Sequence, residues 1–224
     1  MITSAANPRL KLIRRLSSRK QRGKSRLFVC EGEDLVDAAL AAGVEPHDLL
    51  VAGEDVEPEL LAGVSTLAHP PRVIGVFRRG DLPAWDDRPA ALALWHVADP
   101  GNIGTLIRTA DAFGAAVALS EGCADPTAPK ALRASAGAIF RVPIGRFDEP
   151  AGVRIALAAR QGEPLSAVDL GERTVFVLGA EREGLPEDVV AACDAVASIE
   201  LSDGAQSLNV AVAGAIALYE RGRR

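Results

Sequence analysis

The chain has 224 residues, of which 48% are hydrophobic and 25% are charged. This composition is typical of a folded protein with one large domain or two small ones, and it excludes a disordered, collagen-like or coiled-coil chain. No apolar run reaches the roughly 18 residues of a membrane span, and no signal-peptide pattern follows the first basic residues. The three scattered cysteines form no disulfide framework, so we expect a cytoplasmic protein with reduced thiols.

The net charge of −5 conceals two oppositely charged parts. Residues 1–26 hold nine basic residues and no acidic one, whereas the rest of the chain holds 16 basic and 30 acidic residues. A basic arm on an acidic body indicates contact with phosphate groups. The arm also has the composition of an organellar transit peptide, but it runs directly into a strand-like segment, which favours a folded element.

The first 80 residues have the pattern of a small α/β domain. Leu10, Ile13 and Leu16 recur at helical spacing and predict an amphipathic helix over 8–20 with a basic outer face. The elements that follow are a helix at 32–42 and strands at 27–30, 48–52 and 72–77. Residues 81–90 are polar and contain two prolines, which predicts a linker between a domain at 1–80 and a second domain at 91–224.

In the second domain strands and helices alternate. The expected strands are 91–98, 115–119, 174–178 and 195–200, and the expected helices are 103–113, 128–137, 150–160 and 207–220. This alternation predicts a mostly parallel sheet with helices on both faces. Because ligands bind at the carboxyl ends of parallel strands, the loops after 98, 178 and 201 are the candidate site.

Several common chemistries lack their required residues. Gly23-Lys24-Ser25 resembles the end of a phosphate-binding loop, but the first glycine is replaced by Ser18. No dinucleotide-binding glycine pattern follows a strand. The three histidines are isolated, so we expect no metal site, and no serine or cysteine has the setting of a nucleophile.

The first candidate loop reads Asp99-Pro-Gly-Asn102-Ile-Gly104-Thr-Leu-Ile-Arg108. It is a tight turn from a strand into a helix, and a guanidinium near a helix N-terminus suits a phosphate or another anion. The plain alternative is that Arg108 is a surface residue paired with Asp111.

The second loop reads Leu178-Gly179-Ala-Glu181-Arg-Glu-Gly184-Leu185-Pro186 and follows a strongly apolar strand. Gly179 permits a ligand to lie close against the backbone. The alternative is an ordinary loop that leads into a helix at Pro186.

The third loop contains Ile199-Glu200-Leu201 and then Gln206-Ser207-Leu208-Asn209. Ser207 or Asn209 is also suited to cap the last helix. That helix is apolar over much of its circumference, so it belongs in a core or in a subunit interface.

These loops, in this order, resemble the SpoU (TrmH-like) family of RNA ribose 2′-O-methyltransferases, part of the SPOUT superfamily. The family pattern N-x-G-x-x-x-R-x-A-x-x-F-G is matched by Asn102, Gly104, Arg108, Ala110, Phe113 and Gly114. R-x-S-x-G-A is matched at 133–138, L-G-x-E-x-x-G-L at 178–185, and S-L-N-V with A-I-x-L-Y-E at 207–220. The patterns of the three loops occur in order with consistent gaps, which makes the resemblance specific. The resemblance covers about 91–222, and more loosely 1–78, which looks like an RNA-binding domain of the ribosomal-protein L30e type.

The resemblance implies a sheet with a deep trefoil knot near the C-terminus, a homodimer formed through the C-terminal domain, and S-adenosylmethionine as cofactor. It implies cofactor binding by Leu178, Gly179, Ile199, Leu201, Leu208 and Asn209. It implies catalytic roles for Arg108, Asn102, Glu181, Ser207 and Asn209, with Arg108 binding phosphate and assisting removal of the 2′-hydroxyl proton, from the partner subunit. The basic first helix is then the RNA grip, through Arg9, Arg14, Arg15, Arg19 and Arg22.

The chain departs from the family at the third loop. Ile-Pro-Met is usual there, and this chain has Ile199-Glu200-Leu201; a glutamate often precedes the serine, and this chain has Gln206. Glu200 puts cofactor affinity in question. The expected activity is methylation of ribosomal RNA, with transfer RNA as the alternative substrate, and a catalytically inactive RNA- or ribosome-binding protein is the alternative function.

Overall fold

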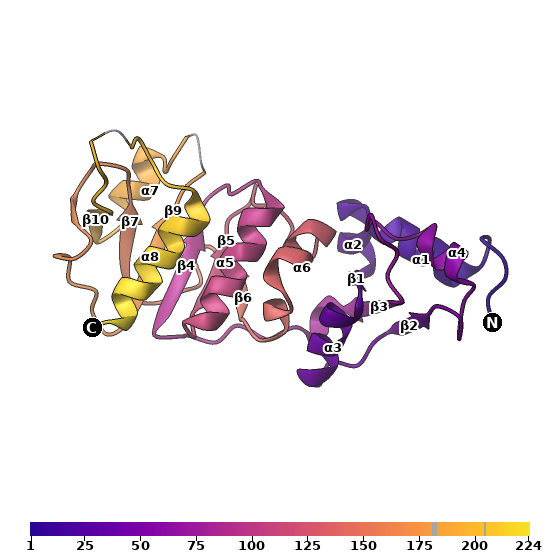
Figure 1. Ribbon diagram of the computed structural model, residues 1–224. Helices are drawn as coiled ribbons and strands as arrows, with labels where there is room; N and C mark the ends of the chain where they lie inside the picture. The colour runs from indigo at the N-terminus through magenta and orange to yellow at the C-terminus, as the bar shows by residue number, and fades with distance from the viewer. Residues whose placement is uncertain (181–182, 204) are drawn as a thin grey trace.

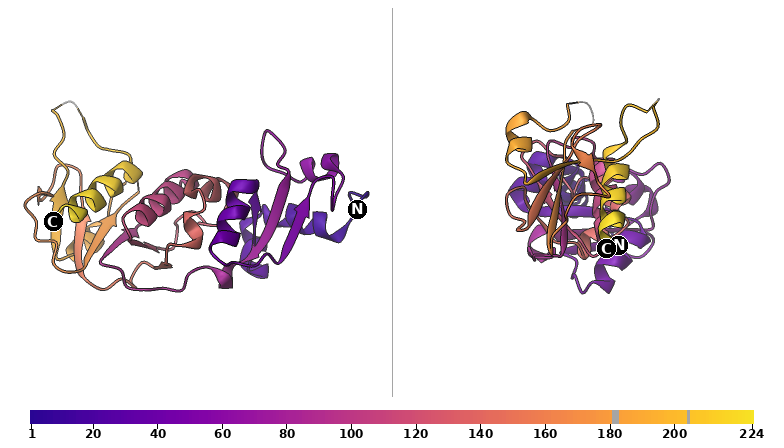
Figure 2. Two further views of the ribbon diagram at one scale, coloured as in Figure 1. Left: turned by 60° about the horizontal axis from the view of Figure 1, so that its bottom comes forward. Right: turned by 90° about the vertical axis from the view of Figure 1, so that its left-hand side faces the viewer.

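The computed structural model describes residues 1–180, 183–203 and 205–224 and shows an elongated molecule with two sheets lying end to end (Figure 1). The N-terminal unit, residues 1–81, surrounds a three-stranded sheet. The C-terminal unit, residues 90–224, surrounds a seven-stranded sheet. Residues 82–89 connect the two units, and the two further views of Figure 2 show the same arrangement.

The N-terminal unit packs helices on both faces of its small antiparallel sheet, whose strand order is β1-β3-β2. Helix α1 covers one face through Leu10, Ile13 and Leu16, and α3 covers the other through Leu35 and Val36. The elements are α1 (Pro8–Leu16), α2 (Arg19–Ser25), β1 (Leu27–Glu31), α3 (Glu33–Ala41), β2 (Asp48–Val51), α4 (Pro58–Ala62), β3 (Val73–Arg78) and the 3-10 turn η1 (Arg79–Asp81).

The basic helix expected over 8–20 is two helices in the structure. Helix α1 ends at Leu16, and α2 begins at Arg19 after Ser18, whose backbone is extended. The Ser17 hydroxyl donates a hydrogen bond to the carbonyl of Arg14 at 2.7 Å. Serine side chains compete with helical backbone hydrogen bonds in this way, so the paired serines end the first helix and the prediction of a single helix is wrong.

The C-terminal unit is built on a sheet with strand order β6-β5-β4-β9-β7-β10-β8, and the six strand pairs described in it are all parallel. Its elements are β4 (Ala90–Leu94), α5 (Pro100–Ala112), β5 (Ala116–Leu119), α6 (Pro129–Ser135), the 3-10 turn η2 (Ala138–Phe140), β6 (Ile144–Arg146), β7 (Val153–Leu157), β8 (Glu163–Pro164), β9 (Thr174–Leu178), α7 (Glu187–Ala191), β10 (Ala195–Ser198) and α8 (Val210–Gly222). Within the described ranges, none of the helices has the length and apolar character needed to cross a lipid bilayer.

Residues 150–160 were expected to form a helix, and they contain strand β7 instead. The strand lies between β9 and β10, with Ile155 opposite Phe176 on one side and Ala195 on the other. A short apolar run does not distinguish a buried strand from a helix by its periodicity, and pairing on both edges outweighs the helix propensity of the alanines here. The prediction is therefore wrong, because a tertiary contact decides this segment.

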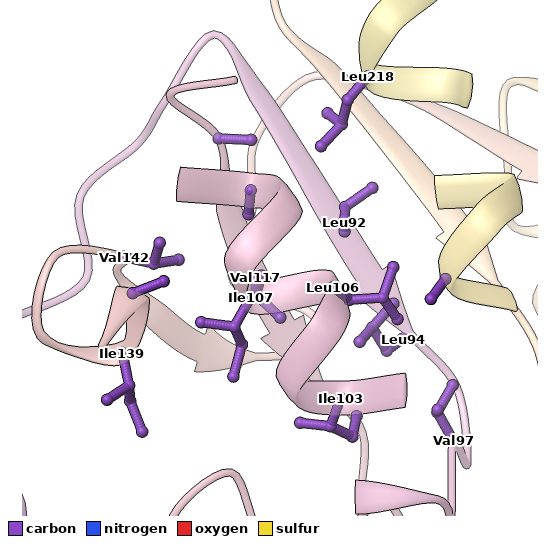
Figure 3. Close-up of a cluster of buried hydrophobic side chains, with 14 of the residues drawn as sticks. Leu92, Leu94, Val97, Ile103, Leu106, Ile107, Val117, Ile139, Val142 and Leu218 are labelled. Carbon is purple, nitrogen blue, oxygen red and sulfur yellow. The ribbon is translucent and has the colours of Figure 1, made fainter. Parts of the chain in front are cut away.

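The main core lies between the sheet and helices α5 and α8. Leu92 and Leu94 of β4 point toward Ile103 and Leu106 of α5, and Leu218 of α8 closes the same layer (Figure 3). All five side chains are at most 1% exposed. This packing fixes α5 and α8 side by side on one face of the sheet.

The opposite face of the sheet is lined mainly by alanine and valine. Ala91, Ala93 and Val177 are buried there beneath Val189 of α7 and the partly buried Trp95. Helices therefore lie on both faces of a parallel sheet, and the predicted α/β class is confirmed. The carboxyl ends of β4, β9 and β7 stand in register at Leu94, Leu178 and Leu157, which positions the loops that follow them along one edge.

Candidate active site

A cavity of about 480 Å³ opens at the carboxyl ends of β7, β9 and β10. Of the residues predicted to bind a cofactor, Leu178, Gly179, Ile199, Leu201 and Leu208 line it. Ser207, predicted to be catalytic, lines it too. The structure therefore brings together the loop after β9, the loop after β10, about 20 residues further along the sequence, and the segment that leads into α8.

Gly179 is held where a side chain has no room. A Cβ atom there would lie 2.2 Å from the backbone of Gly184. The loop folds back on itself at this point, with the Gly184 amide donating to the Ala180 carbonyl at 2.9 Å. The close return of the backbone forms one wall of the cavity. Glu181, which was predicted to be catalytic, lies outside the described residues.

The sequence interpretation missed the wall that follows β7. Leu157, Ala158, Ala159 and Gln161 line the cavity, and the first three fall in the segment that was expected to be a helix. Recognising a strand over 153–157 would have placed them, because its carboxyl end lies at the same sheet edge. Arg160 ties this wall to the last loop, since its guanidinium donates to the carbonyls of Asp203 and Ala205 at 3.1 and 2.6 Å.

The lining of the cavity fits S-adenosylmethionine. Its volume lies in the range of about 300–1,000 Å³ that is usual for small-molecule sites. Apolar side chains such as Leu157, Ile199 and Leu208 suit a flat purine ring, and Gln206 and Ser207 supply polar groups for a ribose or an amino-acid end. Glu200 is exposed and does not line the cavity, so the unusual residue of the third loop leaves the lining in place.

The first and third loops meet through their asparagines. Asn209 Nδ2 donates to Asn102 Oδ1 at 3.1 Å. Asn209 Oδ1 caps helix α8 by accepting from the amide of Ala211 at 2.9 Å. Asn209 therefore caps the helix and joins the two loops at once, and it does not line the cavity itself.

The start of helix α5 is fixed by Asp99. Its carboxylate accepts hydrogen bonds from the amides of Gly101 and Asn102 at 2.6 and 3.0 Å, and from Lys130 Nζ of α6 at 2.7 Å. The hydrogen bond from Lys130, followed by that from the Asn102 amide, holds the pKa of Asp99 below its usual value. This N-cap orients the first turn of α5 and the Asn102 side chain with it.

Arg108 lies on the exposed side of α5, six residues beyond Asn102 and so about 9 Å further along the helix axis. The expected alternative, a pair with Asp111, is wrong, because Asp111 binds Arg141 at 2.6 Å. In the part of the chain that the structure describes, the Arg108 guanidinium has no hydrogen bond or ion pair, and it does not line the cavity. One copy of the chain therefore leaves this guanidinium open to solvent.

The predicted RNA-binding arginines divide into three kinds. Arg14, Arg15 and Arg19 are exposed. Arg9 is half-exposed and bound to Asp48 through two hydrogen bonds from its Nε at 2.9–3.0 Å, so much of its charge is already neutralised. Arg22 is 3% exposed and is paired with Asp125, so the prediction that it contacts RNA is wrong.

Two family models match the chain. One, described as the SpoU rRNA Methylase family, matches residues 89–219, and the other, described as the MRM3-like substrate binding domain, matches residues 7–78. A 23S rRNA (guanosine(2553)-2′-O)-methyltransferase of Bacillus subtilis is 32% identical over 97% of each chain. A 23S rRNA (uridine(2479)-2′-O)-methyltransferase of Streptomyces viridochromogenes is 34% identical over 80% of this chain and 66% of its own.

Solved structures resemble the whole chain. An rRNA methyltransferase from Sinorhizobium meliloti with bound AdoMet (S-adenosylmethionine) superposes with a TM-score of 0.89 at 30% identity and covers 99% of this chain and 97% of its own. The SpoU methyltransferase AviRb from Streptomyces viridochromogenes, also in complex with AdoMet, has a TM-score of 0.84 at 26% identity and covers 97% of each chain.

Proposed function

The chain belongs to the SpoU rRNA methylase family, and we propose that it transfers a methyl group from S-adenosylmethionine to a ribose 2′-hydroxyl of 23S ribosomal RNA. The observation that carries the proposal is the cavity of about 480 Å³ formed by the loops after β7, β9 and β10. Relatives similar over nearly the whole chain carry this activity or this cofactor in their names. Ribosomal RNA is favoured over transfer RNA because those full-length relatives are named for it, and the cytoplasm is the proposed place of action for the same reason.

The cofactor would be held by Leu178, Gly179, Ile199, Leu201 and Leu208, with Asn209 keeping the last loop in place. When bound, S-adenosylmethionine supplies an electrophilic methyl group on a sulfonium. Because backbone groups and apolar side chains form most of this lining, Leu201 can take the place of the usual methionine. The resemblance to SPOUT proteins also leads us to propose the trefoil knot. It is supported by α8, which returns to contact β4 and β9 although β10 lies beyond β7.

The 2′-hydroxyl is a weak nucleophile, so this protein must orient it and favour loss of its proton. We assign that role to Arg108, whose guanidinium binds the adjoining phosphate and stabilises negative charge developing on the ribose oxygen. Asn102 and Ser207 orient the loops around the acceptor, and Glu181 is proposed to assist them. The supporting observation is that Arg108 is exposed and unpaired among the described residues, so its charge is available to a ligand.

The position of Arg108 supports a homodimer. Thr105 and Thr109, its neighbours on α5, line an apolar groove of about 480 Å³ between α5 and α8. Phe113, Val212 and Tyr219 of the groove are 41%, 47% and 56% exposed. Exposed apolar patches of this kind mark contact surfaces. Two copies joined along this groove would bring the Arg108 of one chain to the cavity of its partner.

RNA binding is assigned to residues 1–80, the connection to residues 81–90 and methyl transfer to residues 91–224. Arg14, Arg15 and Arg19 are exposed on the basic helices and are available to phosphates. The match of residues 7–78 to a substrate-binding domain supports this division.

The test is an incubation of the purified protein with labelled S-adenosylmethionine and unmodified 23S rRNA, followed by nucleoside mass analysis. We expect one 2′-O-methyl nucleoside. Cofactor binding is measured separately by calorimetry. If the protein neither binds the cofactor nor transfers a methyl group, the alternative function holds, which is an inactive RNA-binding protein with the same fold.

A further inference from the structure

The two units of the molecule are joined by a largely buried ion-pair cluster, here called the Asp125 seam, which consists of Arg22, Arg79, Asp125 and Thr127. The Asp125 carboxylate lies in the C-terminal unit, between β5 and α6, and is 6% exposed. From the N-terminal unit, Arg22 of α2 reaches it at 2.8 Å and Arg79 of η1 reaches it at 2.7 Å. In Figure 1, α6 lies beside α2 and β1 where the two units meet.

Both oxygens of the Asp125 carboxylate have partners, whereas Arg79 Nε is buried without a hydrogen bond among the described residues. Asp125 also accepts from the amide and the hydroxyl of Thr127, at 3.0 and 2.8 Å. The other side of the Arg22 guanidinium donates to the carbonyls of Leu16 and Ser17 at 2.9 and 2.7 Å. Burial raises the pKa of Asp125, but the hydrogen bonds from Thr127 and the charges of Arg79 and Arg22 lower it by more. The pKa of Asp125 is therefore below its usual value, and the carboxylate stays ionised. A buried carboxylate held by two guanidinium groups and a threonine favours one geometry, because displacing it leaves a buried charge unpaired.

Apolar contacts surround the seam. Phe140 of η2 packs against both Phe28 and Phe77 of the N-terminal unit, with ring centroids 6.2 and 5.7 Å away. Gly137, whose φ is +81°, lies so close to Ala38 of α3 that an added Cβ would come within 2.4 Å of the alanine methyl. The segment at 133–138 that matches the family pattern therefore packs against the N-terminal unit, away from the cavity.

We propose that Asp125 is a positioning residue that locks the two units into one rigid body, so that RNA held by the N-terminal unit presents one ribose to the methyl-transfer site. The inference rests on the proposed function for its consequence, and on the contacts at Asp125 for the lock itself. Two features are required for such a lock. Both are present: the charged groups come from both units, and the surrounding apolar surfaces interdigitate. With this joint rigid, the spacing between the basic helices and the cavity is set by the fold, and the residues of the connecting segment do not set it.

The lock is tested directly by a distance measurement. Spin labels are placed at Glu45→Cys and Glu172→Cys, both exposed and one in each unit, in a Cys193→Ser background that leaves only buried cysteines. Labelled chain is diluted with unlabelled chain, and the label-to-label distance is read by pulsed electron spin resonance. We expect one narrow distance in the unaltered seam and a clearly broadened distribution in Asp125→Asn. A broad distribution with the seam intact, or an unchanged narrow one in Asp125→Asn, overturns the lock.

The functional consequence is read from 23S rRNA transcribed in vitro. In Asp125→Asn we expect kcat per cofactor-binding site to fall about tenfold, while the KM for RNA and the Kd for S-adenosylmethionine stay within twofold. We also expect methyl groups at nucleotides that the unaltered protein does not modify. A role limited to fold stability would leave the pattern of methylated nucleotides unchanged, and that result would refute positioning by Asp125.

Two further variants keep the test decisive. Asp148→Asn removes the same charge from an exposed pair with Arg146 in the C-terminal unit, and it should alter neither the distances nor the methylation pattern. If Asp125→Asn fails to fold, the same measurements are made on Arg79→Gln, which removes the Arg79–Asp125 ion pair and keeps the Arg22–Asp125 pair. If the unaltered protein methylates no 23S rRNA, the proposed function fails, and the distance measurement still decides the lock.

Discussion

The cavity and the Asp125 seam are formed by different kinds of groups. The cavity is lined by backbone and by apolar side chains such as Leu178 and Ile199, so its shape depends on how the loops pass each other. The seam depends on a few charged side chains, of which Arg22 and Asp125 are buried and Arg79 is partly buried, and each is matched to a particular partner. Sites of the first kind tolerate exchange of side chains but not added atoms against the backbone, whereas sites of the second kind tolerate no change of charge.

A large effect on cofactor affinity is expected where an added side chain strikes the cavity wall. Gly179→Val places atoms within 2.2 Å of the Gly184 backbone. Overpacking of this kind costs about 1–3 kcal/mol, which corresponds to a roughly 5- to 150-fold rise in the Kd for S-adenosylmethionine. Calorimetry checks it, and Gly80→Ala is the control because its Cβ meets nothing within 4 Å. Equal affinity in Gly179→Val would mean that this loop does not border the cofactor.

The same variant tests whether Arg108 acts across a dimer. Arg108→Ala should reduce methyl transfer by roughly 10²–10³-fold, the usual loss for one electrostatic group, without changing cofactor affinity. Mixing Arg108→Ala chains with Gly179→Val chains creates dimers that contain one site with both an intact cavity and an intact arginine. We therefore expect activity to return on mixing two nearly inactive proteins. If mixing restores nothing, although the mixed dimers are shown to form, Arg108 acts within its own chain.

The seam should respond to acid in a defined direction. Because the native pKa of Asp125 is lowered, its ionised form stabilises the fold above the ordinary carboxyl pKa of about 3.9. That contribution is lost as the pH falls from about 4 toward the lower native value, where the carboxylate takes up a proton. Removing one partner of a buried pair costs roughly 3–5 kcal/mol, so Asp125→Asn should unfold at lower denaturant and lose less stability than the unaltered protein between pH 6 and pH 3. Parallel acid curves for the two proteins would exclude Asp125 as the titrating group.

The comparison of Arg22 with Arg14, Arg15 and Arg19 also shows where prediction from sequence stops. Charge alone placed all four on the RNA-binding surface, and only packing reveals that Arg22 faces inward to Asp125, a residue 103 positions away. Residues 178–185 and 199–208 could be predicted as site loops because strand ends and glycine spacing are local patterns. The cavity wall after β7 could not be predicted, because pairing with β9 and β10 determines that residues 153–157 form a strand.

RNA affinity separates the exposed arginines from the buried one. Each phosphate contact contributes about 0.7–0.9 to the slope of log affinity against log salt concentration. Replacing Arg14, Arg15 and Arg19 by glutamine should therefore weaken RNA binding and reduce the slope by roughly two to three. Arg22→Gln should lower the free energy of unfolding and leave the slope unchanged, because its guanidinium is buried. Filter binding at several salt concentrations measures both, and a slope that falls in Arg22→Gln would return this residue to the RNA-binding surface.

The smallest effect is expected at the residue that departs most from the family pattern. Glu200 stands where the family usually has proline, yet its side chain is exposed and does not line the cavity, while Ile199 and Leu201 on either side do line it. Glu200→Pro removes one negative charge from the rim and stiffens the backbone, and neither change alters the lining. We therefore expect the Kd for S-adenosylmethionine to change by less than about twofold, or less than about 0.4 kcal/mol, with the same methylated nucleotide. A gain of tenfold or more would show that rigidity of the third loop limits cofactor binding in this chain, and that the cavity depends on this side chain after all.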